Sequence, residues 1–261
     1  MPHSDPPRTG VPRADPVRIG LLQCDRLDPE DAAVDGDYEV LFDRLLSGRG
    51  LDLVRYRADL GQLPASTTEG DGWIIPGSRL SVYDDVEWIH GLARFTERVL
   101  ADDRPLVGVC FGHQMIGRVL GAAVERAPGG WNIGAIDYRL HRPAPGESVI
   151  DDAVRSDGGH LDGFRLVASH RDQVLELPSG AELLASAPTC PVAAFTAGRA
   201  LAIQGHPEFT AALARSLHRK RLDAVGPQRV ADADASLETP LDRDRVGAWI
   251  AAALTGIGPV E

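Results

Sequence analysis

The residue with the clearest chemical character is Cys110, in the segment GVCFG at 108–112. This segment follows a β-type run over 105–109 and precedes a helical run over 113–120. A nucleophile between two small residues at a strand-to-helix turn is typical of a nucleophile elbow. The positive end of the helix that follows would also favour a thiolate. We expect Cys110 to be an activated nucleophile, whereas the motif taken alone fits a buried structural cysteine equally well.

A second segment, QGHPE at 204–208, supplies a candidate base and follows a β-type run over 200–203. The imidazole of His206 can act as general base towards a thiol, and the carboxylate of Glu208 can orient the ring and stabilise its cation. Pro207 restricts the backbone between them. A surface turn explains HPE alone more often than a site does. Combined with the elbow, the segment predicts a triad of Cys110, His206 and Glu208.

The elements expected around these segments indicate an α/β fold. Short β-type runs at 17–23, 51–56, 72–78 and 105–110 alternate with amphipathic stretches at 38–46 and 86–100. The second stretch places its apolar side chains on one predicted helical face, formed by Val86, Ile89, Ala93, Thr96 and Leu100. This alternation predicts a doubly wound, mostly parallel sheet flanked by helices. Cys110 would then lie at the carboxyl edge of the sheet, where such folds bind ligands.

The ends and the middle of the chain have a different composition. Residues 1–16 are rich in Pro, Gly and charge, which predicts a disordered tail. Residues 17–261 are expected to form a single domain with a C-terminal helical extension over about 210–261, including a capping helix at 242–254. β-rich segments follow Ala122. Residues 141–163 are expected to form an irregular loop that is either a lid or partner surface or an ordinary solvated loop.

Composition excludes several classes of function. The 27 Lys and Arg against 38 Asp and Glu give a net charge of −11, which disfavours binding to nucleic acid. No apolar stretch approaches the roughly 18 residues that span a membrane, so we expect a cytoplasmic protein. The three widely spaced cysteines indicate neither a disulfide framework nor a metal knuckle. Cys24 and Cys190 are interpreted as small core residues.

Four segments, in this order, resemble class I glutamine amidotransferases. The oxyanion strand and loop of that family resemble DGWIIPGS at 71–78, and its catalytic motifs resemble VCFGHQ at 109–114 and GHPE at 205–208. Its substrate-binding segment resembles SHRDQV at 169–174. The resemblance covers about residues 17–209 and is closest to the GMP-synthase-like branch, which includes stand-alone γ-glutamyl peptidases. It implies a flavodoxin-like fold.

The resemblance also implies roles for single residues. The backbone N–H of Phe111 and one from Gly77 or Ser78 would donate to an oxyanion. The glutamyl end of the substrate would contact Gln114, Ser169 and His170. Ser78 and Arg171 stand where the family usually has glycine, which suggests an altered pocket. His113, at the start of a helix, is expected to be exposed.

The implied reaction is cleavage of a γ-glutamyl amide by Cys110, with His206 as base and acid, Glu208 as its orienting carboxylate, and a thioester intermediate. It needs no metal or organic cofactor. The chain shows no phosphate-binding motif of a synthetase, so two enzyme hypotheses stay open: a self-sufficient hydrolase of γ-glutamyl compounds, and a glutaminase that delivers ammonia to a synthetase in trans. A catalytically silent binding module of the same fold is the third. The sequence leaves the oligomeric state open.

Overall fold

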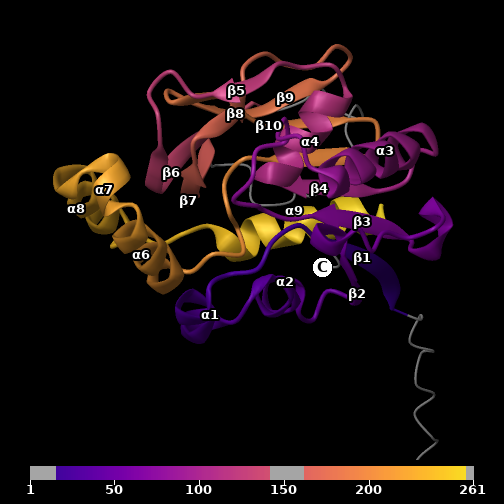
Figure 1. Ribbon diagram of the computed structural model, residues 1–261, viewed down its shortest axis with the longest axis horizontal. Helices are drawn as coiled ribbons and strands as arrows, with labels where there is room; N and C mark the ends of the chain where they lie inside the picture. The colour runs from indigo at the N-terminus through magenta and orange to yellow at the C-terminus, as the bar shows by residue number, and fades with distance from the viewer. Residues whose placement is uncertain (1–15, 142–161, 257–261) are drawn as a thin grey trace, which may run out of the picture.

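The computed structural model describes residues 16–141 and 162–256 (Figure 1). A nine-stranded sheet forms its centre, in the order β2-β1-β3-β4-β11-β10-β9-β6-β7. The strands from β2 to β11 pair in parallel. Their bounds are Val17–Gln23 for β1, Leu51–Arg57 for β2, Gly72–Ile75 for β3, Leu106–Val109 for β4 and Ala200–Ile203 for β11. The expected doubly wound α/β fold is confirmed.

The other half of the sheet is antiparallel. It contains β6 (Asn132–Leu140), β7 (Gly163–His170), β9 (Glu182–Ala187) and β10 (Cys190–Ala197). Two short strands, β5 (Val124–Arg126) and β8 (Asp172–Val174), form a separate ladder. Of the irregular loop expected at 141–163, residues 142–161 lie outside the described residues, as do residues 1–15 of the expected tail.

Helices cover both faces of the sheet. The helices α3 (Glu87–Ala101) and α4 (Phe111–Val119) lie on one face, and α2 (Tyr38–Leu46) and α9 (Arg243–Thr255) lie on the other (Figure 1). Successive residues of β3 point to opposite faces, as the pleat requires. Ile74 belongs to the core of α2 and α9, whereas Trp73 and Ile75 belong to the core of α3 and α4.

The buried face of α3 is wider than the predicted one and includes Leu92, Phe95 and Val99. Its buried residues are Ile89, Leu92, Phe95, Thr96 and Val99. Val86, Ala93 and Leu100 of the predicted stripe are partly buried and pack against the same core, beside the fully buried residues. The largest apolar side chains determine the outcome: the ring of Phe95 packs edge-on against Trp73 of β3, with 5.0 Å between ring centroids.

The C-terminal helices lie in two places. The helix α9 packs against α2, β3, β4 and β11, with Trp249 and Ile250 fully buried, so it completes the sheet's cover. An arm formed by α6 (Ala211–Lys220), α7 (Leu222–Val225) and α8 (Pro227–Ser236) projects to the left in Figure 1. The arm docks on β6, where the N–H of Ala135 donates to Ser236 Oγ at 2.8 Å. The short helix α1 (Pro29–Asp35) contacts α6. None of the described helices has the length and apolar character needed to cross a membrane.

Candidate active site

Cys110 lies at a strained turn between β4 and α4. Its backbone has φ 53° and ψ −100°, a conformation that L-residues rarely adopt, and its side chain is buried. The flanking glycines make the turn possible. A Cβ at Gly108 would overlap the carbonyl of Gly112, and a Cβ at Gly112 would overlap the carbonyl of Ile75. The geometry is therefore that of a nucleophile elbow.

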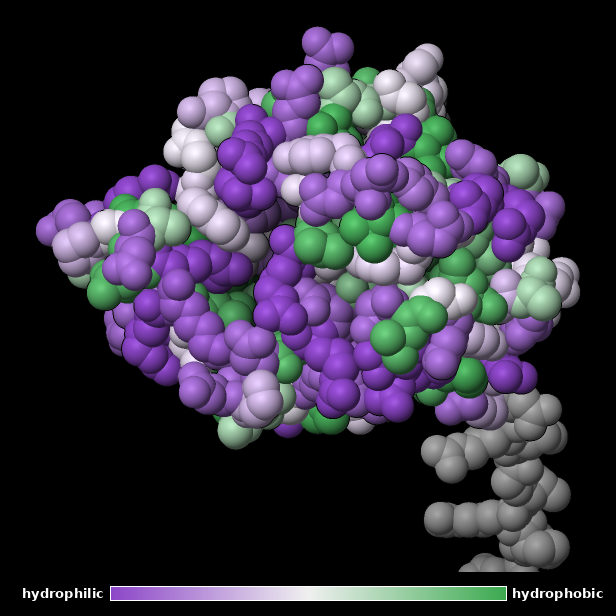
Figure 2. All heavy atoms as spheres, in the orientation of Figure 1, coloured by the Kyte–Doolittle hydropathy of each residue, from purple (hydrophilic) through white to green (hydrophobic). Residues whose placement is uncertain are grey.

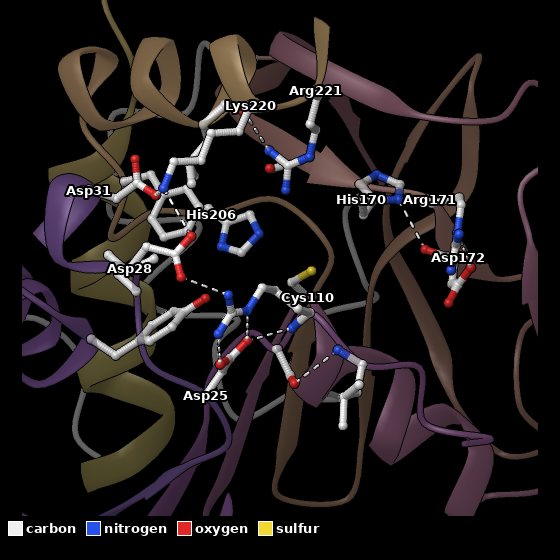
Figure 3. A pocket seen from close by; sticks show the side chains of 18 of the residues that line it. Asp25, Asp28, Asp31, Cys110, His170, Arg171, Asp172, His206, Lys220 and Arg221 are labelled. Carbon is white, nitrogen blue, oxygen red and sulfur yellow. Dashed lines mark hydrogen bonds and ion pairs between the residues drawn. The ribbon is translucent and has the colours of Figure 1, made fainter. Parts of the chain in front are cut away.

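His206 lies beside this elbow because β11 pairs in parallel with β4, with Ile203 opposite Val109. The carboxyl ends of these neighbouring strands present His206 and Cys110 to the same pocket (Figure 3). The backbone N–H of His206 donates to the Val167 carbonyl at 2.8 Å. Its ring stacks on Phe209, with centroids 4.0 Å apart and planes 5° apart.

Glu208 is the third residue of the predicted triad. Its Oε1 lies 2.8 Å from His206 Nδ1, and both side chains are buried. Burial alone would lower the pKa of His206, but the Glu208 carboxylate and the sulfur of Cys110 outweigh it and raise that pKa to about 10. His206 is therefore an imidazolium at neutral pH, held between the Glu208 carboxylate and the sulfur of Cys110.

Two backbone segments lie close to Cys110 and His206: the start of α4 and the chain after β3. Phe111 is the first residue of α4, so its N–H has no acceptor within the helix. Gly77 follows β3 and passes beside the base: a Cβ there would lie 3.1 Å from His206 Cε1 and 3.2 Å from the Tyr38 hydroxyl. Ser78 lines the cavity, and its Oγ accepts the N–H of Leu80 at 3.2 Å.

Arg79 anchors the Gly77–Ser78 loop, a feature that the sequence analysis missed. Its guanidinium contacts Asp25 through Nε–Oδ2 at 2.9 Å and Nη2–Oδ1 at 3.0 Å, and its backbone N–H donates to the same carboxylate at 2.8 Å. A further bond joins Nη1 to Asp28 Oδ1 at 2.9 Å. Asp25 follows β1 and Arg79 follows β3, which are neighbouring parallel strands. The sequence signal for this ion pair was an acidic residue shortly after one predicted strand and a basic residue shortly after a neighbouring one.

Gln114 lies one turn after Cys110 and is nearly fully buried. Its Nε2 donates to the Asp172 carbonyl at 2.7 Å and to Gln204 Oε1 at 3.2 Å. Both amide hydrogens therefore bind the protein, and the carbonyl oxygen is the atom left for a ligand. Such an oxygen can accept a hydrogen bond from an ammonium but cannot donate to a carboxylate.

Ser169 and His170 end β7, and both line the cavity. The ring nitrogen Nδ1 of His170 lies 3.0 Å from the Asp172 carbonyl, so it carries the proton and donates. Burial lowers the pKa of His170 to about 4, which keeps the ring neutral at physiological pH.

His113 is not exposed, contrary to the expectation. Its side chain is fully buried, and its ring packs on Phe195 with 5.1 Å between centroids. Burial lowers its pKa to about 3. The start of α4 lies inside the molecule because the elbow does, so a position early in this helix does not imply contact with solvent. Cys24 and Cys190 are buried in the core, as expected.

The cavity lined by Cys110, His206, Gln114, Ser169 and His170 has a volume of about 300 Å³. Figure 2 shows this face hollowed between the helical arm and the body, with mainly hydrophilic residues around the hollow. Besides the residues named above, the lining includes Asp31, Trp131, Arg171, Asp172, Leu217, Lys220 and Arg221. Within residues 16–141 and 162–256, no cluster of His, Cys, Asp or Glu is suited to hold a metal ion.

Comparison with known proteins agrees with this geometry. The family model for glutamine amidotransferase class-I matches residues 38–221. The chain belongs to the class I glutamine amidotransferases. Gamma-glutamyl peptidase 3 of Arabidopsis thaliana is 31% identical over 67% of this chain and 70% of that protein. A GMP synthase of Cupriavidus pinatubonensis is 34% identical over 53% of this chain, but only 25% of that longer protein is matched.

Solved structures of the family have the same fold. A glutamine amidotransferase from Thermotoga maritima superposes with a TM-score of 0.68, at 19% identity, over 91% of this chain and 96% of that one. A glutamine amidotransferase from Methylobacillus flagellatus gives a TM-score of 0.63, at 19% identity, over 93% of both chains.

Proposed function

We propose that this chain hydrolyses a γ-glutamyl amide bond through a γ-glutamyl thioester on Cys110. The observation that carries the proposal is the strained Cys110 beside the buried His206–Glu208 pair, at the ends of neighbouring parallel strands. Relatives named gamma-glutamyl peptidases, 31% identical to this chain, support the substrate class.

The proposed reaction begins with attack of the Cys110 thiolate on the γ-carbonyl carbon. The oxyanion accepts from the Phe111 N–H and from the N–H of Gly77 or Ser78, each worth about 10² to 10³ in rate. The His206 imidazolium gives its proton to the leaving nitrogen as the C–N bond breaks. Neutral His206 then takes a proton from water, hydroxide attacks the thioester, and glutamate leaves as the sulfur is restored.

The glutamyl end of the substrate is assigned to the side of the pocket that contains Gln114, Ser169 and His170. The Gln114 carbonyl oxygen suits the α-ammonium, because its amide hydrogens already bind Asp172 and Gln204. Gln114→Ala should therefore raise KM more than it lowers kcat.

The test is a panel of γ-glutamyl amides and peptides incubated with the purified chain, with free glutamate as the readout and Cys110→Ala as the control. We expect turnover by the chain alone, faster for some γ-glutamyl compound than for glutamine, and none by the variant. Turnover by Cys110→Ala would contradict the proposed nucleophile.

A second candidate is a glutaminase that delivers ammonia to a synthetase in trans. It is favoured by relatives named GMP synthase, of whose length about a quarter is matched. In that case every compound would be inert until a synthetase is added, after which glutamine would turn over. If the chain binds γ-glutamyl compounds without ever cleaving them, it is a binding module with the same fold.

A further inference from the structure

The pocket extends well beyond the groups that the proposed hydrolysis uses. Past His206, the wall is built by the chain that follows it into the arm, with Phe209, Leu217, Lys220 and Arg221 lining the cavity. This wall faces the leaving side, because His206 must reach the leaving nitrogen to protonate it. The residues assigned to the glutamyl end come from β7 and α4, and Figure 3 shows His170 of β7 on the other side of Cys110 from His206.

Most charges in this wall neutralise one another. Lys220 Nζ binds Asp31 Oδ2 at 2.6 Å and Asp28 Oδ2 at 2.9 Å. Asp28 also binds Arg79, which in turn binds Asp25. Each of the three carboxylates is paired with Arg79 or Lys220, so the two cations leave this network a net charge of −1.

Arg221 is the exception. Among the residues that the structure describes, its guanidinium has no carboxylate partner, and its one hydrogen bond runs from Nη1 to the Leu217 carbonyl at 3.5 Å. Its Cζ lies 4.6 Å from the centroid of the Trp131 ring, and Arg171 approaches the same ring at 5.8 Å. Burial lowers the pKa of Arg221. In Figure 3 the side chain points into the pocket between His206 and His170.

An unpaired guanidinium in a cavity is a site for an anion. Its planar donors match a carboxylate in bidentate geometry, and the stacking on Trp131 reduces the conformational freedom that binding would otherwise cost. A partly desolvated guanidinium also gains more from an anionic ligand than an exposed one does. Neither ammonia nor a simple amine, as leaving group, could make use of this arrangement.

We propose that Arg221 binds a carboxylate carried by the leaving amine, so that the substrates are γ-glutamyl amino acids and short γ-glutamyl peptides. The inference rests on the proposed function and deepens it, because it specifies the class of leaving group. The apolar Leu217 and Phe209 lie in the same wall and can contact the body of such a leaving group.

The experiment compares γ-glutamylglycine with γ-glutamylglycinamide, which differ only in the leaving-group carboxylate. Wild type should prefer the acid in kcat/KM by about 10- to 100-fold, the usual strength of a hydrogen-bonded charge pair. Arg221→Gln should bring this ratio close to one, and Arg221→Lys should restore part of it. Arg219→Gln is the matched control, because it removes a charge from an exposed position of α6 outside the cavity lining.

Binding of the same two compounds to Cys110→Ala, by calorimetry, separates this inference from the proposed hydrolysis. Preference for the acid that depends on Arg221, without turnover by the wild-type chain, would retain the subsite and reject the hydrolase. Turnover with an equal loss in Arg221→Gln for the acid, the amide and glutamine would place Arg221 at the α-carboxylate and overturn the inference. An unchanged ratio in Arg221→Gln, or no binding of either compound, would overturn it as well.

Discussion

His206 experiences two opposing effects whose balance determines its protonation. Burial disfavours its charge, and Glu208 at 2.8 Å together with the sulfur of Cys110 favours it more strongly. The neighbouring His170 and His113 are also buried but lack such partners, so their pKa values fall to about 4 and about 3. At neutral pH, His206 is thus charged and able to donate a proton, whereas His170 and His113 are both neutral.

Substitution of Glu208 should therefore change the pH dependence of catalysis as well as its rate. Glu208→Gln removes the main group that raises the pKa of His206, so the alkaline limb of the kcat/KM profile should move to lower pH. The variant should retain measurable turnover, whereas His206→Ala should lose at least about 10³-fold. The measurement is kcat/KM from pH 5 to pH 10. An alkaline limb at the wild-type pH in Glu208→Gln would exclude the carboxylate from tuning His206.

His113 should make the protein less stable in mild acid. Its folded pKa of about 3 lies below the ordinary value of about 6.5, so the unfolded chain binds more protons between these values. The free energy of unfolding should then fall as the pH drops from about 6.5 towards 3. His113→Gln should flatten this dependence in urea unfolding at pH 7 and pH 5, and the partly exposed His90→Gln should not. Equal slopes in all three proteins would refute the assignment.

The strand–elbow–helix unit of β4 and α4 depends on close approach of three backbone segments. Gly112 lies against the carbonyl of Ile75 at the end of β3, and Gly108 lies against Gly112 itself. These contacts hold the loop after β3 beside Cys110. The same glycines that permit the bend at Cys110 therefore also align the two backbone segments that we propose as sources of oxyanion donors.

Gly112→Ala should disrupt this unit. Its Cβ would overlap backbone rather than a flexible side chain, and overpacking of this kind typically costs about 1–3 kcal/mol. Gly129→Ala is the control, because a Cβ there meets nothing within 4 Å. Thermal unfolding and γ-glutamyl hydrolysis should both be impaired in Gly112→Ala and near wild type in Gly129→Ala. Normal activity of Gly112→Ala would show that the backbone contact is dispensable.

A series of ion pairs connects three distant segments of the chain around the pocket. The loop after β1, the loop after β3 and the end of α6 come from distant parts of the sequence. Ion pairs among Asp25, Arg79, Asp28 and Lys220 link these three segments at the wall of the cavity. The arm is thereby fixed over the same cavity that contains Cys110.

Arg79→Met should loosen the oxyanion loop without removing any group from the proposed chemistry. We expect kcat to fall by about tenfold, with a smaller change in KM. Loss of an oxyanion donor lowers kcat by about 10²-fold or more, and a donor that is mobile but still present should lower it less. Arg94→Met is suited as a control, since Arg94 pairs with Glu87 on the exposed side of α3. A change in KM alone would indicate that Arg79 contacts substrate instead of positioning the loop.

The sequence identified the parts of the protein whose signals are local. Helix α2 matches the predicted range 38–46 because its apolar residues recur with the helical period, and β1 matches 17–23 because it is a short, nearly continuous apolar run. The elbow was likewise predictable, since its steric demand for glycine falls within five residues. The short α1, β5 and β8 were missed because they have too few residues to show a period.

What remained depends on residues far apart in the chain, whose distances no local pattern encodes. His113 is buried because Phe195 packs on it, and the side-chain amide of Gln114 donates to the Asp172 carbonyl, 58 positions away, and to Gln204. Arg221 looks like any surface arginine in the sequence. Only the folded chain places it over Trp131, without a carboxylate partner among the described residues, inside the cavity of Cys110. Local sequence thus determined the fold class and the proposed triad of Cys110, His206 and Glu208, and long-range packing decided what surrounds them.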